Sequence, residues 1–245
     1  MMKVFHKQMK QINQKLMKGN YELLTGRCEL HLYKTNDFKL HKDIISPFQA
    51  LQELAKKEIN ADLQIISSFR SYERQKHIWN MKVSGKREIF DDNEHPIDIT
   101  VLQPKEIIQK IMRFSALPGA SRHHWGTDID IYDANECKKS DVKLTHNECI
   151  KGGVFEKLHC WIDEKISLNQ LGGFYRPYAQ DLGGVALEKW HISYAPISSL
   201  YFNQYDINLL KKSLLVDEIL LRESILDNLE FLFKQYIQNI SQTTT

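Results

Sequence analysis

The stretch SRHHWGTDID, residues 121–130, places two histidines, a glycine and two carboxylates within ten residues and holds few aliphatic side chains. Such a segment is poorly suited to a hydrophobic core but well suited to a binding site. Gly126 can adopt a positive φ, so the chain can turn there and bring His123 from a loop and Asp130 from a strand to one point. We therefore expect a turn followed by an extended segment that carries site residues.

A second group, Glu188 with Trp190 and His191, begins an apolar, strand-like stretch near the end of the chain. A catalytic zinc ion needs about three nitrogen or oxygen ligands and an exchangeable water. His123, Asp130 and His191 offer that set, although the chain lacks an HExxH helix. Zinc lowers the pKa of its bound water toward ~7, and Glu188 is placed to accept the released proton.

A positively charged donor would complete such a site by neutralising an oxyanion or a substrate carboxylate. Arg70 is the candidate, because it lies in SSFRSYERQ (67–75), where the β-rich run LQIISSF (63–69) ends and Ser71 can cap a helix. An ordinary surface ion pair is the alternative interpretation of Arg70.

Composition bounds the class of protein. The 245 residues, 42% of them hydrophobic, suffice for one sizeable core with peripheral helices but hardly for two full domains. The net charge is +2 with interleaved signs, which argues against nucleic acid or an anionic membrane as partner. The four cysteines lack CxxC spacing, and we expect free thiols.

The first twenty residues carry lysines throughout and contain no apolar core of a secretory signal. No stretch is long and apolar enough to span a bilayer. We therefore expect a cytoplasmic protein, or a periplasmic or exported one if the sequence is a trimmed form or uses another route.

Apolar spacing predicts most of the regular structure. Helices are expected at 3–18, 47–58, 104–114 and 153–166, from Ser71 onward, and as one or two helices after Asp206; strands are expected at 63–69 and 188–194, and a Gly-rich aromatic loop at 171–184. We expect one structural domain, with a zinc peptidase core at 61–200 between helical extensions at 1–60 and 201–245.

The segments SSFRSYERQ, LPGASRHHWGTDID and EKWHISY occur in this order over roughly residues 63–195. They resemble the signature segments of the D-Ala-D-Ala carboxypeptidases of the vancomycin-resistance type, within the LAS (M15) zinc peptidases. The central element S-x-H-x-x-G-x-x-x-D corresponds to 121–130 and the closing E-x-W-H to 188–191. Three ordered motifs are far more specific than any one alone.

The resemblance implies an α+β fold with a small antiparallel sheet flanked by helices. It also implies that His123, Asp130 and His191 bind Zn²⁺ and that Glu188 is the base. The residues that it places at the substrate are Arg70, Gln75, Ser121 and Trp190. The implied partners are peptidoglycan peptides or muropeptides.

Two positions depart from the family pattern. Asp128 stands where a small residue is common, and on a strand it would share a face with Asp130, either supporting the ligands from behind or competing for the metal. Lys189 replaces a frequent proline. His124 is expected to lie behind the ligands or on the surface and not to bind the metal, because adjacent side chains on an extended chain point to opposite faces. Tyr175 and its neighbours fit a substrate-facing loop and simple packing equally well.

The function that these features favour is zinc-dependent hydrolysis of a D-amino-acid-containing bond in peptidoglycan stem peptides, with D,D or L,D specificity left open. A non-catalytic zinc-binding or cell-wall-binding module of the same fold is the alternative, and Glu188 argues against it because zinc binding alone does not need that carboxylate. A purely helical interaction protein would leave all three motifs unexplained.

Overall fold

The structure is a computed structural model, and it describes residues 20–93 and 95–241. The helix predicted at 3–18 lies outside these residues. The fold is α+β, as expected. A four-stranded antiparallel sheet has the order β3-β4-β6-β5, and a separate two-stranded sheet pairs β1 with β2. The strands are β1 (Leu32–Lys34), β2 (Lys39–His41), β3 (Leu63–Ser67), β4 (Asp128–Asp133), β5 (Phe174–Tyr175) and β6 (His191–Tyr194).

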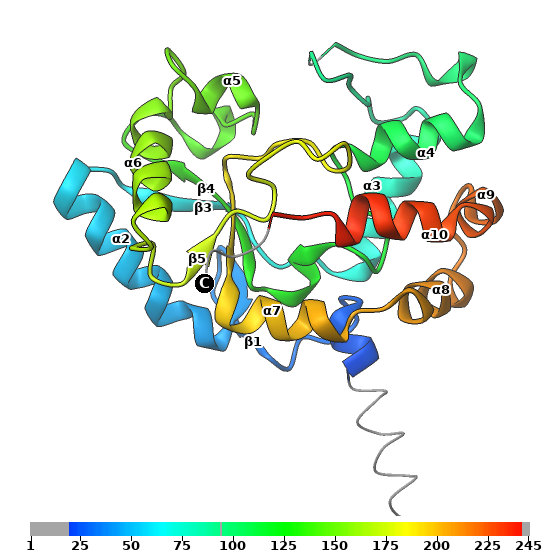
Figure 1. Cartoon of the computed structure of the whole chain (residues 1–245), viewed down its shortest axis with the longest axis horizontal. Coiled ribbons are helices and arrows are strands. Elements are labelled where there is room, and N and C mark those ends of the chain that lie inside the picture. The colour runs from blue at the N-terminus through cyan, green and yellow to red at the C-terminus, as the bar shows by residue number, and fades with distance from the viewer. Residues whose placement is uncertain (1–19, 94, 242–245) are drawn as a thin grey trace, which may run out of the picture.

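Helices make up most of the remaining regular structure (Figure 1). They are α2 (Ile45–Ile59), α3 (Tyr72–Val83), α4 (Pro104–Met112), α5 (His146–Cys149), α6 (Glu156–Ser167), α7 (Ala195–Gln204), α8 (Ile207–Val216), α9 (Arg222–Asp227) and α10 (Leu229–Leu232), with a π-helical segment at Phe233–Gln238. Residues 20–24 are also helical. Within the described residues no helix is both long and apolar enough to cross a membrane.

Strand β4 has two chemically different faces. Ile129 and Ile131 are fully buried on one face, while Asp128 and Asp130 alternate with them and point to the other. The antiparallel register with β6 sets Ile129 opposite Ile192 and Asp130 opposite His191. The sheet therefore gives its apolar face to the core and its polar face to the site.

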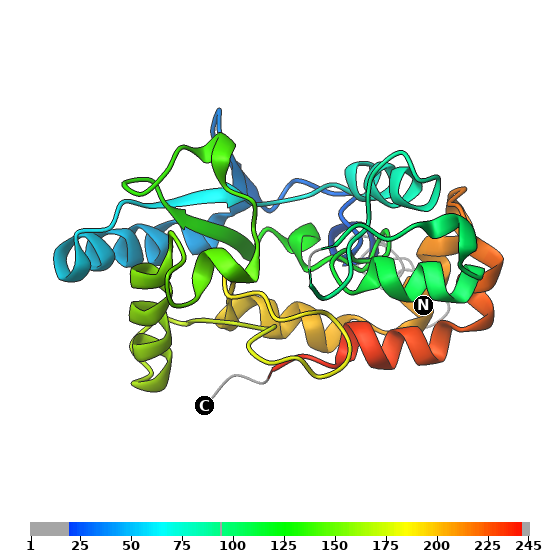
Figure 2. The ribbon, with the colours of Figure 1, turned by 90° about the horizontal axis from the view of Figure 1, so that it is seen from above.

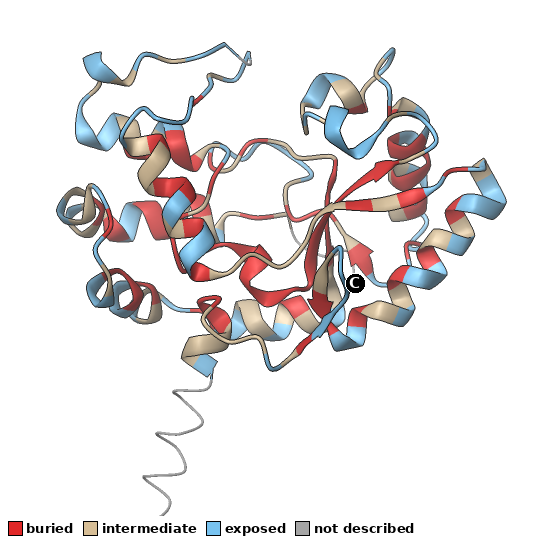
Figure 3. Cartoon of the chain, turned by 180° about the vertical axis from the view of Figure 1, so that it is seen from behind, coloured by how far each residue is buried: buried red, intermediate tan, exposed pale blue. Residues whose placement is uncertain are grey.

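The apolar face packs against α2 and α6 and forms what we call the sheet core. Helix α2 contributes Phe48, Leu51 and Ala55, at the spacing of one helical face. The buried members of the sheet core are Leu40, Ile44, Phe48, Leu51, Ala55, Ala61, Leu63, Ile65, Ile129, Ile131, Leu158, Trp161, Ile162, Leu171, Phe174 and Ile192. Figure 3 shows this burial along the central strands and the inner helix faces.

A second cluster, the helix core, joins α3 and α4 to the C-terminal helices. Figure 2 shows these helices at the end of the molecule away from α2 and α6. Its buried members are Leu24, Trp79, Ile89, Ile108, Ile111, Met112, Leu117, Trp125, Tyr205, Leu210, Leu214, Ile219, Ile225, Leu229, Leu232, Phe233 and Tyr236. Residues from before 61 and after 200 thus contribute to the same core as the middle of the chain.

Several predicted boundaries need correction. The region after Asp206 forms three helices and a π-helical segment instead of one or two helices, with Leu221 at φ 62° before α9. The strand predicted at 188–194 begins only at His191, because Lys189 and Trp190 form a turn. Ser71 caps α3 as expected, its side chain accepting from the Arg74 amide. The four cysteines are free.

Candidate metal and catalytic site

A short 3-10 helix, Arg122–Trp125, positions His123 directly before β4. It ends at Gly126, whose φ is 69°. A Cβ at this position would lie 2.6 Å from Leu32 Cδ2 and 2.9 Å from the His41 amide nitrogen, so only glycine fits both the conformation and the space. The turn that we predicted at Gly126 is confirmed, and it brings His123 alongside β4.

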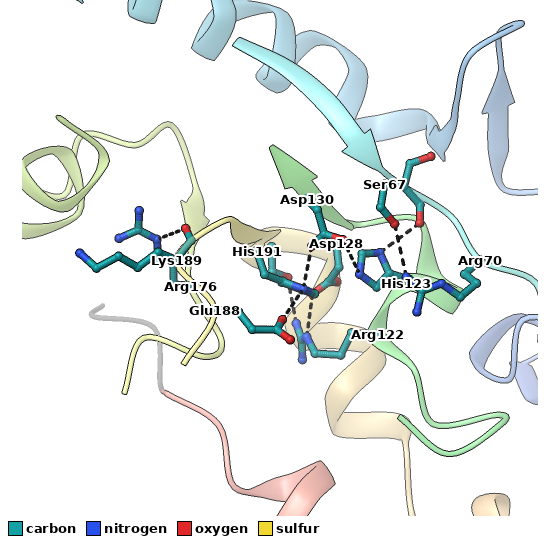
Figure 4. A network of polar contacts seen from close by, with 12 residues as sticks. Ser67, Arg70, Arg122, His123, Asp128, Asp130, Arg176, Glu188, Lys189 and His191 are labelled. Carbon is teal, nitrogen blue, oxygen red and sulfur yellow. Dashed lines mark hydrogen bonds and ion pairs between the residues drawn. The ribbon is translucent and has the colours of Figure 1, made fainter. Parts of the chain in front are cut away.

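Three side chains predicted as metal ligands converge on one point. Asp130 and His191 are cross-strand neighbours, and the potential ligand atoms of His123, Asp130 and His191 all lie within 4.8 Å of one another. His123 Nε2 lies 3.4 Å from Asp130 Oδ2, and His191 Nδ1 lies 3.3 Å from Asp130 Oδ1. Figure 4 shows the three residues facing one another from the loop and the two strands.

Hydrogen bonds behind the two histidines fix which ring nitrogen is free. His123 Nδ1 lies 3.0 Å from the Ser68 carbonyl oxygen, which can only accept, so Nδ1 carries the proton. His191 Nε2 lies 3.1 Å from Asp128 Oδ1 and donates in the same way. The other ring nitrogens, Nε2 of His123 and Nδ1 of His191, are therefore the ones that face Asp130, in the orientation that metal ligation requires.

The donor set suits a zinc ion. Two imidazoles and one carboxylate are a common ligand set for catalytic zinc, and ligands about 2 Å from a tetrahedral ion lie about 3.3 Å apart. The observed separations of 3.4 and 3.3 Å agree with that spacing. Asp130 Oδ1 is buried without a hydrogen-bond partner among the described residues, which leaves an acceptor for a cation to satisfy.

The charge states of His123 and Asp130 also suit a metal. Burial lowers the pKa of His123 to about 4, so the ring is neutral at physiological pH. Burial raises the pKa of Asp130, but His123, His191 and Arg70 outweigh that effect and hold it at about 2. A neutral imidazole and an ionised carboxylate are the forms that bind metal. Burial lowers the pKa of His191, but Asp128, Asp130 and Glu188 outweigh that effect and raise it well above its usual value, so a metal would displace a proton from this ring.

Glu188 lies beside this group because the chain turns before β6. The His191 amide donates to the Glu188 carbonyl at 3.4 Å, and in this turn Glu188 Oε2 lies 3.3 Å from His191 Nδ1. A continuous strand would have placed residues three apart on opposite faces. Burial raises the pKa of Glu188, opposed mainly by His191.

Asp128 sits behind the metal ligands and not among them. Its Oδ1 accepts from Arg122 Nε at 2.7 Å as well as from His191, and its Oδ2 accepts from the Thr127 hydroxyl at 2.8 Å. Burial raises the pKa of Asp128, but Arg122 and His191 outweigh it and lower that pKa well below its usual range. Of the two expectations for Asp128, the geometry fits support of His191.

Arg122 is a residue that the sequence interpretation missed. Its guanidinium also donates to Ser193 Oγ at 2.8 Å and to the Tyr175 hydroxyl at 3.1 Å, tying β4, β6 and the Gly-rich loop together. The sequence feature that could have indicated this ion pair is a carboxylate on a predicted strand, Asp128, with an arginine six residues earlier on the other side of a glycine turn.

Arg70 and Gln75 were both expected at the substrate, but only Arg70 lies at the cavity. Arg70 lines the cavity, and its guanidinium donates to Gln75 Oε1 at 3.0 Å and Ser67 Oγ at 3.4 Å. Gln75, expected at the substrate, is fully buried and does not line the cavity. Its amide donates to the Ala116 carbonyl at 2.7 Å, so Gln75 holds Arg70 in place from behind.

The cavity that contains the site has a volume of about 800 Å³. The predicted substrate residues Ser121 and Trp190 line it, together with Glu188, and so does Tyr178, whose ring centroid lies 5.1 Å from that of His191. The Gly-rich loop thus contributes one cavity wall at Tyr178. Such a concave, partly apolar space is typical of a small-ligand site.

Other residues of this loop hold the turn that carries Glu188. Arg176 is buried, pairs with Asp163, and donates from Nε to the Lys189 carbonyl at 2.7 Å. Lys189 Nζ lies 2.6 Å from Asp163, so the lysine that replaces a frequent proline still has a fixed place. His124 lies outside the ligand group and is fully buried, so of its two expected places the surface one is wrong: its Nδ1 lies 2.6 Å from the Arg70 carbonyl, and its Nε2 accepts from the Gly119 amide.

Similarity searches give relatives in sequence and in structure. Two relatives from Haemophilus influenzae, both described as uncharacterized proteins, are 40% identical over 107 residues, covering 41% of this chain and 72% of the relative, and 32% identical over 124 residues, covering 49% and 92%. VanYB in complex with D-alanine-D-alanine has a TM-score of 0.47 at 19% identity, covering 71% of this chain and 83% of that one. The LdcB LD-carboxypeptidase has a TM-score of 0.45 at 20% identity, covering 83% and 72%.

The family model described as VanY, D-alanyl-D-alanine carboxypeptidase, matches residues 37–197, which is well over half of the chain. The matched range contains His123, Asp130, Glu188 and His191. The chain belongs to the VanY family of D-alanyl-D-alanine carboxypeptidases.

Proposed function

We propose that the protein is a zinc-dependent carboxypeptidase that hydrolyses a peptide bond at a D-amino acid near the carboxyl end of peptidoglycan stem peptides. The observation that carries this proposal is the convergence of two histidines, each oriented by a hydrogen bond at its other ring nitrogen, and Asp130, with Glu188 beside them. Family membership supports the substrate class. His123, Asp130 and His191 would hold the zinc ion.

The proposed division of labour follows from the charges around the cavity. When bound, zinc would polarise the scissile carbonyl and lower the pKa of the attacking water. Glu188 accepts the proton of that water and delivers it to the leaving amine, since its carboxylate lies beside the ligands, lines the cavity and is not itself in the ligand group. Arg70, which is held in place by Gln75, stabilises negative charge on the reacting group or on the substrate carboxylate.

Glu188→Gln tests the assignment. An amide keeps the size of the side chain but cannot take a proton, so turnover of tetra- and pentapeptide muropeptides should fall by about 10²–10⁴-fold. Zinc content should stay stoichiometric, because Glu188 is not in the ligand group. Mass spectrometry of the shortened peptides separates the two specificities, because D,D cleavage converts the pentapeptide to a tetrapeptide and L,D cleavage converts the tetrapeptide to a tripeptide.

Glu164→Gln on the exposed side of α6 is the matched control and should retain full activity. A folded, zinc-loaded Glu188→Gln protein that cleaves as fast as the parent would rule out the assigned base. A zinc-loaded parent that binds these peptides without cleaving them would instead identify a binding module.

A further inference from the structure

The cavity extends beyond the metal group toward the helix core. Its sheet end is lined by His123, Asp130 and His191, and its far end by Lys82 near the end of α3, by Arg87, and by residues 112–117 that follow α4. Arg70 lies between these ends, directly before α3. In Figure 2, α3 and α4 occupy the end of the molecule away from α2 and α6.

Lys82 is an unusual residue in this setting. It is 9% exposed and makes no hydrogen bond or ion pair within 4 Å in the part of the chain that the structure describes. Burial lowers its pKa to about 8, and Arg87 and Arg70 lower it further than Glu188 raises it. A buried ammonium without a counter-ion is costly, which favours a role with a ligand.

Two other basic side chains of the cavity are already neutralised by ion pairs. Arg113 pairs with Asp92 at 2.8 Å and Asp181 at 2.7 Å, and Arg122 pairs with Asp128 at 2.7 Å. Arg87 makes no ion pair among the described residues, although the exposed Glu88 also lines the cavity. Lys82 and Arg87 therefore leave uncompensated positive charge at the far end.

Helix geometry directs Lys82 toward Arg70. Gln75, Ile78 and Lys82 recur at intervals of three and four residues on one buried face of α3. Side chains on a helix lean toward its N-terminus, so the Lys82 ammonium is carried back along α3 toward Gln75, which holds Arg70. Arg70 and Lys82 thus present two cations in succession along the cavity.

We propose that Lys82 and Arg87 form an anion subsite, separate from Arg70, that receives a second carboxylate of the peptide substrate. This inference rests on the proposed function in taking a peptide as the ligand. In such a complex the reacting bond of the peptide lies at the metal group, and its terminal carboxylate contacts Arg70. An acidic side chain on the last residue, or on the residue before it, would then lie at Lys82. The subsite makes the enzyme selective for acidic over amide side chains near the cleaved bond.

Matched peptides test the subsite by equilibrium binding. The four probes are N-acetylated tripeptides ending in D-Glu or D-Gln, and a second pair ending in D-Ala with Glu or Gln before it. Calorimetry on zinc-loaded Glu188→Gln protein measures affinity without turnover. We expect at least one acidic peptide to bind 10-fold or more tightly than its amide twin, and the pair that shows this identifies the position of the second carboxylate.

Three lysine variants in the Glu188→Gln background locate the source of the preference. Lys82→Met should remove it, and Lys82→Arg should keep it, since only the charge matters. Lys165→Met is the matched control, because Lys165 is also buried but pairs with Glu58 at 2.7 Å and does not line the cavity. Methionine at 82 removes an unpaired buried charge, so a normal thermal unfolding transition is expected.

Equal affinity for both members of each pair, no binding of any probe, or a preference that survives Lys82→Met would overturn the subsite. Hydrolysis of the same peptides by the parent protein is scored separately. A Lys82-dependent preference without any hydrolysis would overturn the carboxypeptidase and keep the subsite. Hydrolysis that ignores the acidic group would overturn the subsite alone.

Discussion

Asp128 accepts hydrogen bonds from His191, Arg122 and Thr127, so its carboxylate is fully engaged before any ligand enters the cavity. A carboxylate in this place keeps a proton of His191 on Nε2 and turns Nδ1 toward Asp130. The residue that departs from the common family pattern therefore orients a predicted metal ligand.

Asp128→Asn tests this role. The amide can still accept from Arg122, but it loses the negative charge that holds His191, so zinc affinity should fall by about 10–100-fold. Competition with a chromophoric chelator measures it. Unfolding free energy should also fall, because the Arg122 charge stays buried without its partner.

Asp133→Asn provides the control on the same strand. Asp133 is equally buried, but its carboxylate accepts from the amides of Asp62 and Asn135, away from the ligands. This variant should lose stability while keeping zinc affinity. If a folded Asp128→Asn protein bound zinc as tightly as the parent, the orienting role would be refuted.

The roles of individual residues could be predicted from the sequence where a local motif contains them. They could not be predicted where the role depends on a partner that is distant in the sequence. His123 and Asp130 flank a glycine turn that is visible in the sequence, and the structure places them together. Gln75 belongs to the same motif as Arg70, but whether it faces the cavity or lies behind Arg70 depends on its contact with Ala116, 41 residues away. No local pattern contains that contact.

The N-terminal cap of helix α3 supports the position of Arg70 in the cavity. Ser71 accepts from the Arg74 amide at 3.2 Å, and Gln75 lies in the next turn, where it holds Arg70. Ser71→Ala should lower the free energy of unfolding by about 1 kcal/mol. It should also raise KM for the peptide, because the first turn that anchors Arg70 loosens.

Asp206→Ala is the comparison for this cap. Asp206 caps α8 in the same way, accepting from the Leu209 amide at 2.7 Å, and does not line the cavity. Denaturant unfolding should show a similar loss for both variants, with KM changed only in Ser71→Ala. Equal KM values in both would mean that the cap has no influence on Arg70.

Among the elements, those with strong periodicity were predicted close to their observed bounds, as at α2 and α4, and the start of α3 was predicted from its capping serine. The short elements were not, since two or three residues, as in β5, carry no period. The turn at Lys189 and Trp190 is held by Arg176 and Asp163, which come from other segments. Tertiary contacts decided these boundaries.

The stability of the whole molecule depends on its C-terminal helices more than it would if these helices were a peripheral extension. Leu232 is fully buried in the helix core, together with residues of α3 and α4. Leu232→Ala should therefore lower the free energy of unfolding by about 2–5 kcal/mol. Leu215→Ala, at a position that is 56% exposed, should change it by no more than about 0.5 kcal/mol.

Chemical denaturation of the two leucine variants checks the helix core. A small effect of Leu232→Ala would mean that the C-terminal helices only cover a body that is stable without them. Apolar spacing after Asp206 could predict helices there but not the surface they pack on, because periodicity identifies a buried face and not its partner.

The register between β4 and β6 decides both which side chains enter the sheet core and which side chains form the metal site. A slip of one residue would turn Asp130 into the hydrophobic interior and Ile129 out toward His191. Burial of an unpaired carboxylate makes such a state costly, and the three ligands would no longer meet. Metal binding would then report on correct assembly, since a chain with misaligned strands could neither bury its isoleucines nor capture the ion.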